Sequence, residues 1–172
     1  MSDAIRVGVI GVGYLGRFHA RIYNDMPGVE LVGVVDTDRE TADRIAAEYD
    51  TRALYDPMAL LDHVDDVSVV VPTSLHRQVA VPYLEKGIHM LLEKPVASTL
   101  EDAKVIVETA RKHNATLQIG HLERFNAGIM ALADHVNKPR FIEAHLLGPF
   151  VERATDVDVV TDLMIHDIDI IL

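Results

Sequence analysis

Three glycines, Gly11, Gly13 and Gly16, are spaced as a turn that can hold a phosphate group. They follow the apolar run 5–10 and open a segment with helical spacing, and Asp36 ends the next apolar run. Gly11 would allow a tight turn, Gly13 would let the backbone approach a pyrophosphate, and Gly16 would let the helix pack on the strand. The helix N-terminus would then offer free N–H groups to the phosphates. This pattern predicts a dinucleotide site.

Two alternatives remain for this turn: a glycine turn without a ligand, and a methyltransferase-type nucleotide site, although such sites usually lack the third glycine. We include the other residues of the turn among the cofactor-binding residues, namely Val12, Tyr14 and Leu15. Asp36 would accept hydrogen bonds from ribose hydroxyls and repel a 2′-phosphate. We therefore expect NAD rather than NADP, although the positive charge of Arg39 weakens that preference.

Apolar runs alternate with helical spacing through the first 120 residues. Strands are predicted over 5–10, 29–35, 67–71, 88–92 and 116–119. Ser98, followed three residues later by Glu101, predicts the start of one of the helices through a capping box. Alternation of this kind gives a parallel sheet covered by helices on both faces. The sequence therefore predicts an α/β fold, a Rossmann-type doubly wound parallel sheet, forming an NAD-binding domain over residues 1–120.

The pattern changes after Gly120. Residues 140–148 alternate so that Ile142, Ala144 and Leu146 share one face, which predicts a half-buried strand of a second sheet. A polar loop is expected over 151–158, and a helix without a stop signal over 159–172. We therefore expect residues 121–172 to be the incomplete start of an α+β catalytic domain for substrate binding and oligomerisation, in a chain truncated at its C-terminal side.

The composition argues against several classes of protein. The 172 residues are 49% hydrophobic, carry a net charge of −11 and include no cysteine. The acidity argues against nucleic-acid binding, and the absence of cysteine excludes disulfides and thiolate metal sites. No signal peptide and no apolar run of about 18 residues is visible, so we expect a cytoplasmic protein without a membrane partner. Acidic residues and His166 in the last segment suggest a polar active-site stripe, and we predict no metal.

The segment "LLEKP", Leu91–Pro95, follows a predicted strand at the sheet edge where open α/β sheets bind ligands. Lys94 would lie there near the nicotinamide end of a bound cofactor. Together with the glycine turn, "VPTSLH" at 71–76 and "DLMIHD" at 162–167, this segment resembles the Gfo/Idh/MocA family (glucose–fructose oxidoreductase and inositol dehydrogenase) over essentially the whole chain. The resemblance implies an NAD(P)-dependent dehydrogenase acting on a sugar or nucleotide-sugar hydroxyl. It also implies a homo-oligomer formed through the second domain.

The resemblance implies that Lys94, Asp162 and His166 are catalytic. His166 would accept the hydroxyl proton, and Lys94 would stabilise the developing alkoxide and disfavour protonated His166. Asp162 and His166 lie four residues apart and would share a helix face, so Asp162 would orient the imidazole or bind a sugar hydroxyl.

The resemblance also implies further cofactor-binding residues, which are Pro72, Thr73, Ser74, His76, Glu93, Lys94 and Arg124. The family segment T-P-N-x-x-H is altered here to Pro72-Thr73-Ser74, which removes an asparagine contact. His19 also fits the family pattern, and we interpret it as a helix-packing residue.

The segment "GHLERFN" at 120–126 resembles the subgroup that acts on UDP-N-acetylglucosamine-type sugars, with Ala127 where that subgroup often has proline. Arg124 would contact the nicotinamide ribose or a substrate phosphate, or else form an interdomain salt bridge. Two alternative functions stay open. One is a noncatalytic NAD-binding or regulatory module that lacks a complete substrate domain. The other is a reductase of the biliverdin or dihydrodiol kind, against which Asp162 and His166 argue.

Overall fold

The computed structural model describes residues 4–133, 135–136, 138–146 and 158–172. Its main body is a six-stranded sheet in the order β3-β2-β1-β4-β5-β6, in which every neighbouring pair is parallel. The strands are β1 (Ile5–Ile10), β2 (Val29–Val35), β3 (Ala53–Leu54), β4 (Asp66–Val69), β5 (His89–Leu92) and β6 (Leu117–Ile119). The predicted Rossmann-type parallel sheet is confirmed. The short β3 was not predicted.

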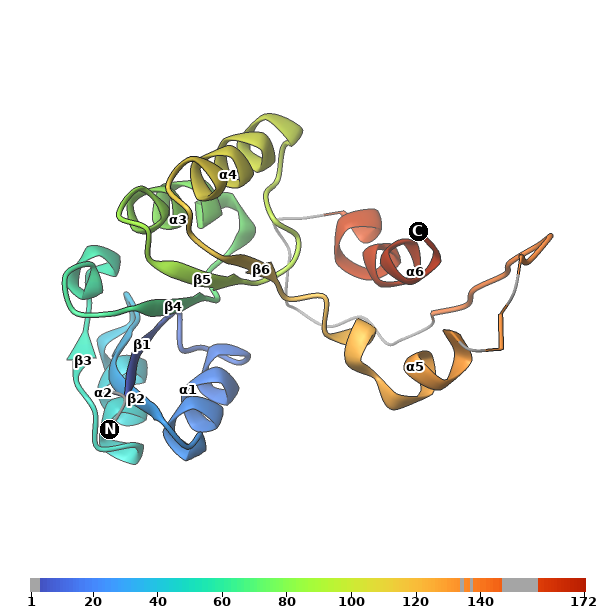
Figure 1. Ribbon diagram of the computed structural model, residues 1–172. Coiled ribbons are helices and arrows are strands. Elements are labelled where there is room, and N and C mark those ends of the chain that lie inside the picture. Colours follow the sequence, from blue (N-terminus) through green and yellow to red (C-terminus); the bar gives the residue numbers. More distant parts are fainter. Residues whose placement is uncertain (1–3, 134, 137, 147–157) are drawn as a thin grey trace.

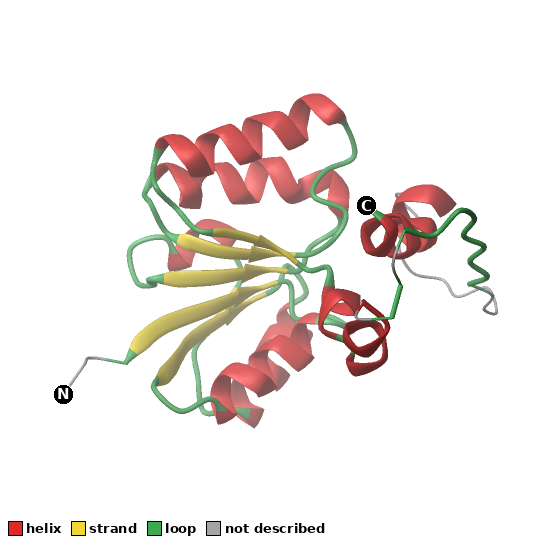
Figure 2. Ribbon diagram, turned by 45° about the vertical axis from the view of Figure 1, so that its right-hand side comes forward, coloured by secondary structure: helices red, strands yellow, loops and turns green. Residues whose placement is uncertain are grey.

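Helices cover both faces of the sheet (Figure 1, Figure 2). One face carries α1 (Gly16–Asp25) and α2 (Arg39–Glu48), and the other carries α3 (His76–Glu85) and α4 (Leu100–Lys112). Two shorter helices, α5 (Ala127–Ala133) and α6 (Ile165–Ile171), lie beside the sheet near the carboxyl ends of its strands. Across the described ranges, no helix has the length and apolar character needed to span a membrane.

Buried apolar side chains fill both layers between the sheet and its helices. Members of the layer under α3 and α4 include Val67, Val69, Tyr83, Leu84 and Ile106. Members of the layer under α1 and α2 include Val9, Val12, Ala20, Val34 and Ile45. Because helices cover both faces, the central strands are apolar on both sides, which explains why they show no alternation of apolar and polar residues.

The start of α4 corrects the prediction by one residue. Thr99 caps the helix rather than Ser98: the Thr99 hydroxyl accepts from the Asp102 N–H at 3.1 Å and donates to the Asp102 carboxylate at 2.8 Å. Glu101 stands three residues after Ser98, and Asp102 stands in the same relation to Thr99. Both pairs fit the capping-box spacing, and the reciprocal bonds form at the second pair.

The strand predicted over 140–148 is not formed in its described part. Residues 141–146 have no strand conformation, and the side chains of Phe141, Ile142 and Leu146 are exposed. A strand requires a hydrogen-bonded neighbour, and no other described segment pairs with this one. Residues 147–148, and 151–157 of the predicted loop, lie outside the described residues. The helix predicted over 159–172 is observed as a π-helical turn, Val160–Met164, followed by α6.

Replacing Thr99 with alanine removes the side chain that caps α4. We expect Thr99→Ala to lower the free energy of unfolding by about 1 kcal/mol, measured by urea denaturation. Ser98→Ala is the matched control, since Ser98 lies one residue before the cap, and we expect it to cost less than about 0.5 kcal/mol. A larger loss in Ser98→Ala than in Thr99→Ala would contradict this assignment of the cap.

Candidate active site at the carboxyl edge of the sheet

The glycine turn lies between the end of β1 and the start of α1. Gly11 has a φ of +84°, and a Cβ built there would lie 2.4 Å from the carbonyl oxygen of Val70. A Cβ built at Gly16 would lie 1.8 Å from the carbonyl oxygen of Gly11. The fold itself therefore requires glycine at positions 11 and 16.

Gly13 differs from the other two glycines, because a Cβ built there would meet no atom within 4 Å. The packing of the chain gives no reason for glycine at this exposed position, whereas the close approach of a ligand would give one. Leu15 at the N-cap of α1 supplies no side-chain hydrogen bond to the first turn. The open space at Gly13 and the uncapped helix start fit the pyrophosphate of a dinucleotide.

Asp36, directly after β2, reaches across to the glycine turn. Its Oδ2 accepts from the Val12 N–H at 3.0 Å, and its Oδ1 accepts from the Asp38 N–H at 3.0 Å. A carboxylate oxygen has two lone-pair sites, so each oxygen keeps one for a further donor. The two backbone contacts fix the carboxylate in an orientation that suits the predicted contact with ribose hydroxyls.

The segment after β4 leads through a 3₁₀ turn, Thr73–Leu75, into α3. His76 is buried, with Nε2 3.0 Å from the carbonyl oxygen of Val71 and Nδ1 3.3 Å from that of Val96. Its ring nitrogens therefore face backbone carbonyls, and the ring holds this turn against the segment that follows Pro95. Contacts with a cofactor stay predictions for the whole segment, namely for Pro72, Thr73, Ser74 and His76.

Lys94 and Asp162 meet at the carboxyl edge of the sheet. The Lys94 Nζ donates to Asp162 Oδ1 at 2.9 Å and to the Asp162 backbone oxygen at 2.8 Å. The two side chains are only 16% and 26% exposed, so this charge-assisted contact is screened less than a surface ion pair. The tertiary structure thus brings together two of the three predicted catalytic residues, which are 68 positions apart in the sequence.

His166 follows Asp162 in the next turn of the helical segment. Its Nδ1 is buried and has no hydrogen-bond partner among the described residues. The pKa of His166 is lowered, first by burial and then by the positive charge of Lys94. A neutral imidazole with an unpartnered nitrogen can accept a proton. The Asp162 carboxylate contacts Lys94 and makes no hydrogen bond to His166 in the described part of the chain. Its two predicted roles, orienting the imidazole or binding a sugar hydroxyl, stay predictions.

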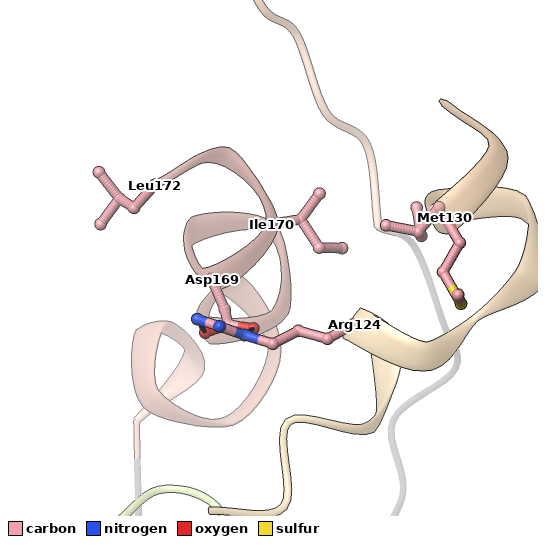
Figure 3. A pocket seen from close by; sticks show the side chains of 6 residues that line it. Arg124, Met130, Asp169, Ile170 and Leu172 are labelled. Atoms are coloured by element: carbon pink, nitrogen blue, oxygen red, sulfur yellow. Dashed lines mark hydrogen bonds and ion pairs between the residues drawn. The ribbon is translucent and has the colours of Figure 1, made fainter. Parts of the chain in front are cut away.

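Arg124 forms a bidentate ion pair with Asp169 of α6, at 2.7 and 2.6 Å (Figure 3). The pair joins the segment after β6 to α6, and the predicted domain boundary near residue 120 stays a prediction. His121 Nδ1 lies 3.6 Å from the same carboxylate, and Arg124 holds the pKa of Asp169 below its usual range. The pair borders a cavity of about 490 Å³, also lined by Ile129, Met130, Ile170 and Leu172. A contact between Arg124 and a cofactor stays a prediction.

A family model described as "Oxidoreductase family, NAD-binding Rossmann fold" matches residues 5–121, the part of the chain that holds the sheet and the glycine turn. The chain belongs to the Gfo/Idh/MocA oxidoreductase family. The predicted resemblance is therefore confirmed at the level of the family.

Relatives in the Gfo/Idh/MocA family include a UDP-N-acetylglucosamine 3-dehydrogenase from Acidithiobacillus ferrooxidans, 44% identical over 98% of this chain and 53% of the relative. A solved structure of that enzyme superposes with a TM-score of 0.89 at 43% identity, covering 97% of this chain and 55% of the other. A myo-inositol dehydrogenase from Lactobacillus casei, solved with NAD(H) and myo-inositol, is 34% identical with a TM-score of 0.70, covering 77% and 41%. The chain spans about half the length of these relatives.

The sequence analysis missed the role of His19 in this Gfo/Idh/MocA chain. The His19 Nε2 lies 3.3 Å from Glu93 Oε1, and the Nδ1 lies 3.2 Å from the Ser68 hydroxyl. His19 is therefore more than a packing residue. The position of Glu93 could have predicted this contact, because a carboxylate that directly follows a buried strand needs a polar partner. The predicted contact of Glu93 with a cofactor stays a prediction.

Two acidic residues of the last helical segment have a cationic partner, which is Lys94 for Asp162 and Arg124 for Asp169. Within the described ranges, no group of three or more histidine and acidic side chains is placed to hold a metal ion. The polar stripe of Asp162, His166 and Asp169 therefore consists of charge pairs around one imidazole.

Substituting Lys94 with methionine tests the charge that acts on His166. Because the Lys94 ammonium lowers the pKa of His166, we expect that pKa to rise in Lys94→Met. An NMR titration of the His166 ring proton measures the change, with Lys104→Met as the control. An unchanged His166 pKa in Lys94→Met would contradict the interaction.

The lowered pKa of His166 also makes the free energy of unfolding depend on pH. Because the pKa of His166 is lowered by folding, the unfolded chain binds more protons than the folded chain as the pH falls below about 6.5. The contribution of His166 to the free energy of unfolding is therefore present above that pH and is lost on the acid side.

Proposed function

We propose that the protein is an NAD-dependent oxidoreductase that transfers hydride between a ring carbon of a sugar or nucleotide sugar and a nicotinamide cofactor. The observation that carries this proposal is the contact of Lys94 with Asp162, 2.9 Å long, beside a neutral His166. It lies at the sheet edge that also carries the open glycine turn and Asp36. A proton acceptor, an ammonium and a dinucleotide turn together suit the oxidation of a hydroxyl group.

The bound nicotinamide would supply the hydride acceptor, and the glycine turn with Asp36 would hold the pyrophosphate and a ribose. The Lys94 ammonium has three donors, two of which point to Asp162, so one is left for the substrate oxygen. The His166 imidazole would take the hydroxyl proton, since burial and Lys94 keep the ring neutral.

NAD is the proposed cofactor because the charge of Asp36 would repel the additional phosphate of NADP. The Arg39 guanidinium stacks on the Tyr55 ring, 4.2 Å from the ring centre, and its N–H donors could still weaken this preference. The myo-inositol dehydrogenase solved with NAD(H) supports the same choice.

A nucleotide sugar is the proposed substrate class. The 44% identity to a UDP-N-acetylglucosamine 3-dehydrogenase supports this choice, as does the segment 120–126 with Arg124. We also propose a homo-oligomer, which is supported by the exposed apolar side chains of the last segments, including Met130, Leu132, Ile168 and Ile171.

Changes at two positions test the dinucleotide site by fluorescence titration with NADH and NADPH. Gly13→Val places a side chain in open space, so we expect the fold to persist while the affinity for NADH falls at least about tenfold. Asp36→Asn removes the repelling charge, and the preference for NADH over NADPH should shrink. Wild-type affinity for NADH in Gly13→Val would contradict the site.

Lys94→Ala tests the chemistry itself. We expect the reduction of NAD by UDP-N-acetylglucosamine or myo-inositol to fall by a factor of about 10²–10⁴, while NADH binding is retained. Absorbance at the NADH band measures turnover, and Lys104→Ala serves as the control. We expect little or no turnover by this chain alone, so the assay is also run on a chain extended at its C-terminal side to the length of its relatives. NADH binding with no turnover on any sugar in both chains would favour the alternative, a noncatalytic NAD-binding or regulatory module.

A further inference from the structure

We propose that Glu93 is a positioning residue for Lys94, held in place by a buried chain of polar side chains that begins on α1. Glu93 directly follows β5 and is only 9% exposed. Its backbone N–H donates to the Val69 carbonyl at 3.0 Å, which fixes the start of the turn that carries Lys94. The catalytic role of Lys94 in this inference rests on the proposed function, whereas the contacts of Glu93 are independent of that function.

The polar chain runs through four side chains. The Tyr23 hydroxyl lies 2.8 Å from Ser68 Oγ, which lies 3.2 Å from His19 Nδ1. His19 Nε2 in turn lies 3.3 Å from Glu93 Oε1. Ser68 is fully buried, and His19 and Glu93 have side chains only 12% and 11% exposed. This series of polar side chains therefore links α1, which follows the glycine turn, to the end of β5.

The chemistry of these groups fixes where the protons lie. Two lone pairs would repel each other between Nε2 and a carboxylate, so Nε2 must carry a proton toward Glu93. In neutral His19, Nδ1 then accepts from the Ser68 hydroxyl, and Ser68 accepts from Tyr23. Burial raises the pKa of Tyr23, which keeps its phenol protonated and able to donate. Every polar side-chain atom along this path then has a partner, as buried groups require.

The far end of the chain bears on Lys94. Glu93 Oε2 accepts from the Lys94 N–H at 3.3 Å, while Oε1 faces His19. On another side, a Cβ at Gly120 would lie 2.9 Å from Oε1, so glycine there leaves the space that the carboxylate fills. Glu93 is thus enclosed by α1, the Lys94 backbone and the end of β6. The carboxylate therefore bonds to the turn that carries Lys94 and packs against the turn at Gly120, which precedes His121.

The test substitutes Glu93 with glutamine, which has nearly the same shape but only one acceptor oxygen. Since both carboxylate oxygens have donors facing them, Glu93→Gln must lose one of the two contacts. We expect the loosened turn to release the Lys94 amine from Asp162. Acetylation by N-hydroxysuccinimide acetate, followed by peptide mass spectrometry, should then modify Lys94 about fivefold faster, the factor given by the loss of one net hydrogen bond.

Lys104 and Lys112, exposed on α4, are internal references for this labelling, and Glu108→Gln on the same helix is the matched control. A merely structural role for Glu93 would lower the melting temperature and also release Lys86 from its ion pair with Asp62, so the labelling of Lys86 would rise together with that of Lys94. A positioning role raises the labelling of Lys94 alone. The labelling needs neither NAD nor turnover, so its outcome is separate from the test of the proposed function.

His19→Gln interrupts the same series of polar contacts at its α1 end. It replaces Glu93→Gln as the test if that variant does not fold. We expect it to raise Lys94 labelling as Glu93→Gln does, and the double variant to add little, because both changes interrupt one path. Additive effects, or a rate at Lys94 that stays at the wild-type value in both single variants, would overturn the proposal.

Discussion

The strands of the sheet all run in the same direction, so their carboxyl ends lie along one edge, and the site depends on this constraint. The glycine turn follows β1, Asp36 follows β2, and Lys94 follows β5 at that edge. Parallel pairing requires a crossover between successive strands, and the helices provide it while they bury both faces. The same apolar packing that stabilises the domain therefore also gathers polar residues from distant parts of the sequence.

The contribution of a polar or charged pair to the stability of the fold depends on how deeply the pair is buried. The pair between Arg6 and Asp65 is short, at 2.6 Å, but its side chains are 46% and 45% exposed, so solvent screens the attraction and the pair stabilises the fold little. His19 and Glu93 are largely enclosed, and leaving one partner of a buried hydrogen bond unsatisfied costs about 1–3 kcal/mol. A buried carboxylate needs its partner in place, and so it fixes the turn around it more firmly than an exposed pair does.

Local patterns made much of the fold predictable. Runs of β-branched residues marked five of the six strands, because strands buried on both faces must be apolar on both faces. The two-residue β3 carries too little pattern to be recognised. The glycine spacing predicted the turn, but only the packing separates Gly16, which the fold requires, from Gly13, which it does not. The capping-box spacing fitted both Ser98 and Thr99, and the structure chose Thr99.

By itself the sequence determined the class of fold, the turn suited to a dinucleotide and the residue types of the site, since each depends on neighbours within one strand or helix. Only the tertiary structure decided which distant side chains meet. It paired Asp162 with Lys94, placed His19 against Glu93, and gave residues 141–146 no strand partner among the segments that the structure describes. Contacts and strand pairing between distant residues depend on how the whole chain packs, and spacing along the sequence does not carry that information.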